Sequence, residues 1–159
     1  MCVHETAPGV MNNEAAVWKA MEDGYGESPI HGALGLSLRV VGRGVVEIHY
    51  HGSDSAANRH GVVGGGALAA MVDSAVMQAC RTTFESGDQA VTLELKTNYL
   101  KPAPKGQPLV ATGTVEHSGR RTAVGTARVL DEAGDLVALG TVTISIRRSA
   151  AAAQPEERS

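Results

Sequence analysis

Three consecutive glycines, Gly64, Gly65 and Gly66, stand directly before an apolar run that carries one carboxylate, Asp73. Glycine allows a ligand to approach the main chain closely. The first N–H groups of a helix have no acceptor inside the helix and lie at its positive dipole end. A helix that begins at these glycines can therefore polarise a carbonyl oxygen, and it supplies an acid farther along the same helix.

The residues from 67 to 80 are nearly all apolar, and the polar interruptions are Asp73, Ser74 and Gln78. This pattern predicts a helix that is enclosed on most sides. A carboxylate in such poor solvent is a candidate functional group, because desolvation raises its proton affinity. The alternative is that Asp73 lies on a narrow polar stripe that faces water, or hydrogen-bonds Ser74 or Gln78.

Gly65 and Asp73 are eight residues apart, which places them roughly 12 Å apart along a helix axis. One chain cannot easily bring both to the same reacting carbon. If both act on one carbonyl, the natural arrangement is a symmetric dimer in which the acid of one subunit faces the glycine N–H of the other. We therefore expect a homodimer with shared active sites. Separately from this geometry, we expect the homo-oligomer to be a tetramer.

The 159 residues, 43% of them hydrophobic, suit one globular domain. A net charge of −3 and an aromatic content of 3% argue against a nucleic-acid partner. The sequence has no apolar run near the roughly 20 residues that span a bilayer, and we expect no membrane partner. Cys2 and Cys80 form no CxxC pair and are interpreted as reduced thiols of a cytoplasmic protein.

We divide the chain into a flexible N-terminus (1–11), one domain (12–148) and a disordered C-terminal tail (149–159). Asn13 can cap a short helix that continues to Met21 and ends at Gly24. Alternating apolar residues and turn signals predict strands at about 34–41, 46–50, 91–99, 108–117, 121–130 and 136–147. The expected fold class is α+β, with one antiparallel sheet wrapped around one long central helix.

Taken together and in their order along the chain, several sequence motifs resemble those of the hotdog-fold acyl-CoA thioesterases of the phenylacetate-pathway type. This family includes 4-hydroxybenzoyl-CoA thioesterases. The resemblance covers about residues 30 to 147. It includes the helix entry Asn58-x-x-Gly61 with Gly65, Gly66 and the later acid Asp73. It also includes the strand and loop from residue 91 to 103 and the late hairpin with Gly119-Arg-Arg.

The resemblance implies a hotdog fold and the hydrolysis of an acyl-CoA thioester, with CoA as part of the substrate and no separate cofactor or metal. It implies that Asp73 is the nucleophile or the general base for water and that the Gly65 N–H binds the thioester oxygen. Asn58 would orient the substrate or the water, and Thr92 would contribute a helping hydroxyl. The resemblance also makes Gly64 and Gly66 candidate substrate-binding residues at the helix start.

Gly64 stands where relatives carry a histidine that fixes the substrate carbonyl or the loop. His60, four residues earlier, is a candidate substitute, although a loop histidine usually faces solvent. Ser74 and Met77 lie within a helical turn of Asp73 and are expected to line the acyl pocket, or else to be packing residues.

Four basic residues at expected loop ends, Lys101, Lys105, Arg120 and Arg121, are candidates for binding the CoA phosphates, or else are solvated loop charges. Glu47, His49 and His51 share a strand face, a spacing compatible with metal ligands, although such residues are usually surface residues. The alternative functions are a non-catalytic acyl-CoA binding or sensing protein and a hotdog hydratase or dehydratase. The second is disfavoured because the central helix contains no histidine.

Overall fold

A computed structural model of the chain describes residues 8–149. The helices are α1 (Pro8–Tyr25), α2 (Pro29–Ala33) and α3 (Gly65–Arg81), and a single 3-10 turn, η1, covers Asp54–Ala56. The strands are β1 (Leu36–Gly42), β2 (Val45–Tyr50), β3 (Gln89–Tyr99), β4 (Leu109–Ser118), β5 (Thr122–Asp131) and β6 (Leu136–Arg147). Residues 1–7 of the expected flexible N-terminus lie outside the described residues, as does the expected tail beyond Ser149.

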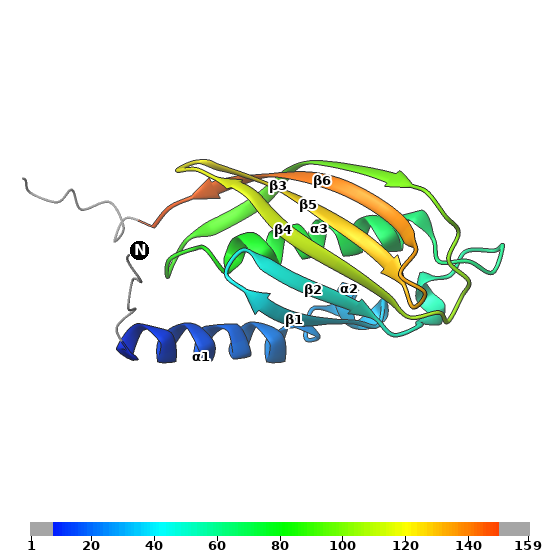
Figure 1. Cartoon of the computed structure of the whole chain (residues 1–159), viewed down its shortest axis with the longest axis horizontal. Helices are drawn as coiled ribbons and strands as arrows, with labels where there is room; N and C mark the ends of the chain where they lie inside the picture. The colour runs from blue at the N-terminus through cyan, green and yellow to red at the C-terminus, as the bar shows by residue number, and fades with distance from the viewer. Residues whose placement is uncertain (1–7, 150–159) are drawn as a thin grey trace, which may run out of the picture.

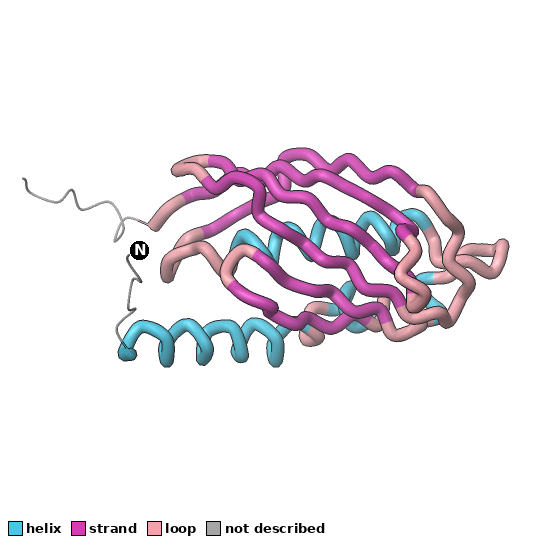
Figure 2. The backbone as a smooth tube through the Cα atoms, viewed as in Figure 1, coloured by secondary structure: helices cyan, strands magenta, loops and turns pink. Residues whose placement is uncertain are grey.

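The six strands form one antiparallel sheet in the order β1-β2-β4-β5-β6-β3. The sheet curves around α3, while α1 runs beside the edge strand β1 (Figure 1). Colouring by secondary structure shows the same layers, with the connecting loops gathered at the two ends of the sheet (Figure 2). The predicted α+β architecture, an antiparallel sheet wrapped around one long helix, is confirmed.

The inner face of the sheet packs closely on α3 because three strands carry a glycine there. A Cβ added at Gly113, Gly125 or Gly140 would lie 2.4, 2.6 or 2.4 Å from the nearest atom of α3. Real Cβ atoms do not approach other atoms this closely, so each glycine is required by the contact with the helix. The rest of the core is aliphatic, as the low aromatic content requires.

Strand β3 departs from the predicted regular alternation. Its pairing with β6 shifts between Thr92 and Glu94, which marks a β-bulge. Thr92 and Tyr99 are seven residues apart, and regular alternation would place them on opposite faces of the sheet. Both instead bond to α3, Thr92 at Asp73 and Tyr99 at Gly65. The bulge therefore turns the two ends of the strand toward the same helix.

Helix α1 is longer than predicted. It begins at Pro8, inside the segment expected to be flexible, and it passes through Gly24 to Tyr25. Proline is well tolerated in the first turn of a helix, which explains the start. Asn13 is consequently an interior residue of α1 and does not cap it. Helix α2 and the turn η1 were not predicted.

Among the described residues, no helix is both long enough and apolar enough to cross a membrane.

Candidate active site

Asp73 lies in the middle of α3, on a stripe of the helix that is less buried than the rest. Most α3 side chains are buried, but Asp73 is half-buried and Gly66 and Arg81 are exposed on the same helix. The prediction of a mostly enclosed helix therefore holds, with the acid on the less buried stripe. One oxygen of the carboxylate, Oδ1, accepts a 2.7 Å hydrogen bond from the Thr92 hydroxyl. The structure thus brings together the acid and the hydroxyl that were predicted to act together.

The glycines form the start of α3 as predicted. Gly64 is the N-cap, in an extended conformation, and its carbonyl accepts hydrogen bonds from Ala67 N (3.0 Å) and Leu68 N (3.1 Å). Gly65 and Gly66 are the first two helical residues, so no helical carbonyl lies one turn before them. Their N–H groups are thus positioned to bind the oxygen of a ligand.

Tyr99 packs over this helix start from the end of β3. Its hydroxyl donates a 2.9 Å hydrogen bond to the Gly65 carbonyl, and a Cβ added at Gly65 would lie 3.3 Å from the Tyr99 ring. A pocket of about 300 Å³ adjoins these two residues and is also lined by Lys101. A role for Tyr99 was not predictable from the sequence, because its side-chain direction depends on the bulge in β3.

The separation of Gly65 and Asp73 is as expected from the sequence. Both are on α3, eight residues apart, and the rise of an α-helix gives about 12 Å between them along the axis. Within one subunit, the glycine N–H and the carboxylate therefore do not face a common carbonyl carbon.

The loop before α3 holds Asn58 and His60. Asn58 Oδ1 accepts a hydrogen bond from His60 N at 2.9 Å, and the Asn58 backbone N–H donates to Val62 O at 2.8 Å. The side-chain oxygen of Asn58 therefore helps to shape the turn. The His60 ring is exposed, and its Nε2 lies 3.3 Å from Arg59 Nε. The structure places both residues at the Gly65 end of α3, away from Asp73.

Ser74 and Met77 differ in their surroundings. The Ser74 side chain is buried, and its hydroxyl shares a 2.6 Å hydrogen bond with the Tyr25 hydroxyl from the end of α1. Burial raises the pKa of Tyr25 to about 12; the bond to Ser74 acts in the opposite direction, and the charge of Asp73 adds to the increase. Ser74 thus joins α1 to the helix that carries the acid, while Met77 is half-buried one turn after Asp73.

The candidate phosphate-binding residues do not gather at one place in the chain. Lys101 Nζ is bonded to Asp131 at 2.8 Å and also to Asp135. Arg120 and Arg121 are exposed and precede β5, whereas Asp131 ends it. The ten residues of β5 span roughly 33 Å, so Lys101 and the two arginines lie at opposite ends of the sheet.

The possible metal ligands on β2 are otherwise engaged. Glu47 Oε2 accepts hydrogen bonds from Arg39 Nε at 2.9 Å and is 3.1 Å from His49 Nε2. His49 and His51 stack on each other with ring centroids 6.4 Å apart. Between residues 8 and 149, no three His, Cys, Asp or Glu side chains are grouped as metal ligands. Cys80 is buried, and burial raises the pKa of its thiol to about 11.

Comparison with known proteins identifies the family. A family model for the thioesterase superfamily matches residues 60–138. The phenylacetic acid degradation protein PaaI from Thermus thermophilus is 32% identical, with a TM-score of 0.68; the match covers 77% of this chain and 100% of that one. The chain belongs to the thioesterase superfamily.

Other members of the thioesterase superfamily support the same placement. Acyl-coenzyme A thioesterase PaaI from Escherichia coli is 26% identical over 122 residues, which cover 77% of this chain and 85% of that protein. A thioesterase from Haemophilus influenzae shares the fold with a TM-score of 0.75 at 21% identity, covering 82% of this chain and 90% of that one. The predicted hotdog fold is confirmed, and the prediction of a thioesterase is confirmed at the level of the family.

Proposed function

We propose that this protein hydrolyses acyl-CoA thioesters to the free carboxylic acid and CoA. The observation that carries the proposal is the hydrogen bond from Thr92 to Asp73 on a helix whose start presents the Gly65 N–H group. The relative from Escherichia coli is named an acyl-coenzyme A thioesterase, which supports CoA as the carrier.

The chemistry needs an acceptor for negative charge and an activated oxygen. Attack on the thioester carbon produces an oxyanion, and backbone N–H groups at a helix start stabilise that charge. Asp73 either removes a proton from the attacking water or attacks the carbon itself. The carbon–sulfur bond then breaks, and CoA leaves as a thiolate that takes up a proton. In the second route, water cleaves the resulting anhydride on Asp73. Neither route requires a metal or a redox cofactor.

The active site in this proposal is shared between two copies of the chain. Gly65 and Asp73 lie too far apart on α3 to contact one carbonyl group, so the Gly65 N–H of one subunit would face Asp73 of its neighbour. Strand β3 supports this arrangement, because it is an edge strand whose Val91 and Leu93 are 63% and 61% exposed. An unpaired apolar edge strand is suited to pairing with another chain. We further propose that two such dimers form a tetramer.

The supporting residues have narrower roles in this proposal. Thr92 holds the carboxylate of Asp73, and Asn58 shapes the loop beside the glycines and presents its amide nitrogen to the substrate or the water. Lys101, which lines the pocket beside Gly65, and the hairpin residues Arg120 and Arg121 are candidates for CoA contacts from different subunits. His60, four residues before Gly64, remains a candidate substrate contact.

A thiol-release assay with a panel of aliphatic and aryl CoA esters tests the proposal. We expect the wild type to release CoA and Asp73→Asn to lose release almost completely while the oligomer stays intact. Asp54→Asn is the matched control, because this carboxylate is exposed and pairs with Lys105 on the surface. Binding without turnover by the wild type would indicate a sensor, and addition of water to an enoyl-CoA would indicate a hydratase.

A further inference from the structure

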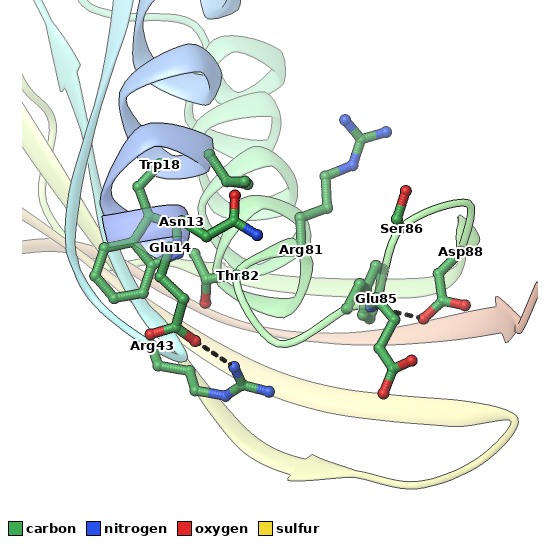
Figure 3. A pocket seen from close by; sticks show the side chains of 11 residues that line it. Asn13, Glu14, Trp18, Arg43, Arg81, Thr82, Glu85, Ser86 and Asp88 are labelled. Carbon is green, nitrogen blue, oxygen red and sulfur yellow. Dashed lines mark hydrogen bonds and ion pairs between the residues drawn. The ribbon is translucent and has the colours of Figure 1, made fainter. Parts of the chain in front are cut away.

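The chain's only tryptophan and only phenylalanine, Trp18 and Phe84, line one pocket of about 520 Å³. The pocket lies between α1, the last turn of α3 and the segment that follows it. Figure 3 shows Trp18, Glu14 and Arg43 on one side of this pocket and Arg81 on the other. Trp18 and Phe84 therefore both line a cavity that has no part in the proposed catalytic step.

Helix α1, which carries Trp18, is fixed along its length by side-chain bonds. Near its start, Glu14 Oε1 accepts from Arg43 Nη1 at 2.8 Å. Farther on, Glu22 Oε1 accepts from the backbone N–H of Val40 at 2.7 Å. At its end, Tyr25 bonds to Ser74 on α3. Trp18 is therefore held over the pocket by a helix that is attached on both sides of it.

The opposite wall is equally anchored. Thr82 at the end of α3 is buried; its hydroxyl accepts from Gly44 N at 2.6 Å and donates to Ala79 O at 2.6 Å. The Arg148 guanidinium lies 5.5 Å from the centre of the Phe84 ring and bonds to Asp88 at 2.7 Å. Both aromatic residues that face the cavity thus belong to fixed parts of the fold.

A second pocket adjoins the Trp18 pocket between α1 and α3. This second pocket, of about 280 Å³, is lined by Tyr25, Gln78 and Arg81, and Arg81 also lines the Trp18 pocket. Asp73 and Arg81 are separated by eight residues of α3, about 12 Å along the helix axis. The two pockets together form a trough between α1 and α3, which we call the α1–α3 trough. The end of the trough nearer to Asp73 is lined by Tyr25, whose hydroxyl bonds to Ser74, the residue that follows Asp73.

We propose that the α1–α3 trough binds the acyl group of the substrate, with the apolar end of the group between Trp18 and Phe84. This inference rests on the proposed thioester hydrolysis. It names the substrate class as acyl-CoA esters whose apolar end, aliphatic or aryl, lies about 12 Å from the thioester carbon. Short acyl groups such as acetyl would leave the aromatic pocket empty.

The charges around the Trp18 pocket favour the acyl end of the substrate over the CoA end. Two arginines, Arg43 and Arg81, face three carboxylates, those of Glu14, Glu85 and Asp88. Binding of CoA phosphates requires an excess of positive charge, and this pocket has none. Its two aromatic rings instead offer apolar area to a hydrocarbon chain or an aryl ring.

Fluorescence of Trp18, the chain's single tryptophan, tests the inference directly. In the Asp73→Asn variant, which keeps the ligand unhydrolysed, decanoyl-CoA is titrated beside phenylacetyl-CoA, whose ring is too near the carbonyl to reach Trp18, and beside acetyl-CoA and free CoA. We expect decanoyl-CoA to change the Trp18 emission and the other three to leave it unchanged. An equal response to free CoA, or no response to any of the four, would overturn the inference.

Kinetic variants provide the second test. We expect Trp18→Ala and Phe84→Ala each to lower kcat/KM for decanoyl-CoA about tenfold or more, with acetyl-CoA little affected. Trp18→Phe should recover most of the loss, which separates a lost contact from a folding defect. Ile30→Ala is the control, because Ile30 is 59% exposed and lines neither pocket of the trough.

The two tests separate failure of this inference from failure of the proposed function. If the wild type hydrolyses CoA esters but the Trp18 and Phe84 variants keep the same chain-length profile, hydrolysis stands and the acyl site is elsewhere. If no ester is hydrolysed but decanoyl-CoA still changes the Trp18 emission, the trough is a binding site and the hydrolysis proposal fails.

Discussion

The Thr92 hydroxyl donates a 2.7 Å hydrogen bond to Asp73 Oδ1, joining the edge strand β3 to the middle of α3. This contact depends on the bulge between Thr92 and Glu94, which turns Thr92 toward the helix. The strand that carries the hydroxyl is also one of the two edge strands of the sheet. Pairing of that edge with a second subunit would therefore set the position of the carboxylate as well as complete the site.

Replacing Thr92 tests this contact. Thr92→Val removes the donor while keeping the branched shape, and we expect kcat/KM to fall about tenfold, since a hydrogen bond to a charged group contributes about 1.5 kcal/mol. Thr92→Ser keeps the hydroxyl and should retain most of the activity. Steady-state thiol release by the two variants measures the change in kcat/KM. Equal losses in both would show that the Thr92 hydroxyl does not contribute to activity.

The Gly65 N–H can be removed by one substitution because of its place in α3. Gly65 is the first helical residue, where proline is tolerated, and Gly64 has φ −67° and ψ 144°, which suit a residue before proline. We expect Gly65→Pro to lower kcat about 100-fold or more through the loss of one oxyanion donor. Gly65→Ala adds the same Cβ, 3.3 Å from the Tyr99 ring, but keeps the N–H. A similar loss in the alanine variant would assign the effect to crowding.

Substituting the glycines on the inner face of the sheet should lower the stability of the fold without acting directly on the catalytic step. Gly125→Ala or Gly140→Ala would bring a methyl group within 2.6 Å of Val76 or 2.4 Å of Val72 on α3, so these side chains or the strand backbone must shift. Overpacking of this kind typically costs about 1–3 kcal/mol of unfolding free energy. Gly42→Ala is the control, because no atom lies within 4 Å of its added Cβ. Urea unfolding monitored by circular dichroism measures the difference, and unchanged midpoints for both inner-face variants would contradict the close packing.

Asp131 predicts an acid-sensitive contribution to stability. The hydrogen bond from Lys101 is the main cause that lowers the pKa of Asp131 below its ordinary value of 3.8, and backbone N–H groups of Asp135 and Ala133 act in the same direction. A lowered pKa in the folded state gives stability that is present above pH 3.8 and is lost as the pH falls through the lowered value. Asp131→Asn should therefore lower Tm at pH 7, and the difference from wild type should shrink in acid. A Tm difference that grows as the pH falls would refute this assignment.

The strands were predictable where burial follows the alternation of apolar residues, as in β2, although not along β3. Val46, Ile48 and Tyr50 are 0%, 0% and 1% exposed, as the period-two pattern of β2 predicts. The acid and the glycines of α3 were found for a similar reason. A carboxylate in an apolar helix and three glycines before it are local signals that need no knowledge of the neighbouring strands.

The contacts that the sequence did not reveal join residues far apart in the chain. Tyr25 and Ser74 are 49 residues apart, and their hydrogen bond depends on how α1 lies beside α3. Lys101 follows β3 and Asp131 ends β5. Both strands pair antiparallel with β6, so their ends lie on the same side of the sheet and the two residues can form an ion pair. The bulge in β3 inserts one residue without a glycine or proline to mark it, so Tyr99 was assigned no role at Gly65.

The shared active site is tested most directly by mixing two inactive variants, Asp73→Asn and Gly65→Pro, in one oligomer purified through two different affinity tags. A mixed dimer contains one site with both mutations and one site with neither. If the Gly65 N–H of one subunit serves Asp73 of the other, the mixed dimer should recover about half of the wild-type thiol release, because one of its two sites is intact. Activity no higher than that of the two parent variants would show that each site lies within a single chain.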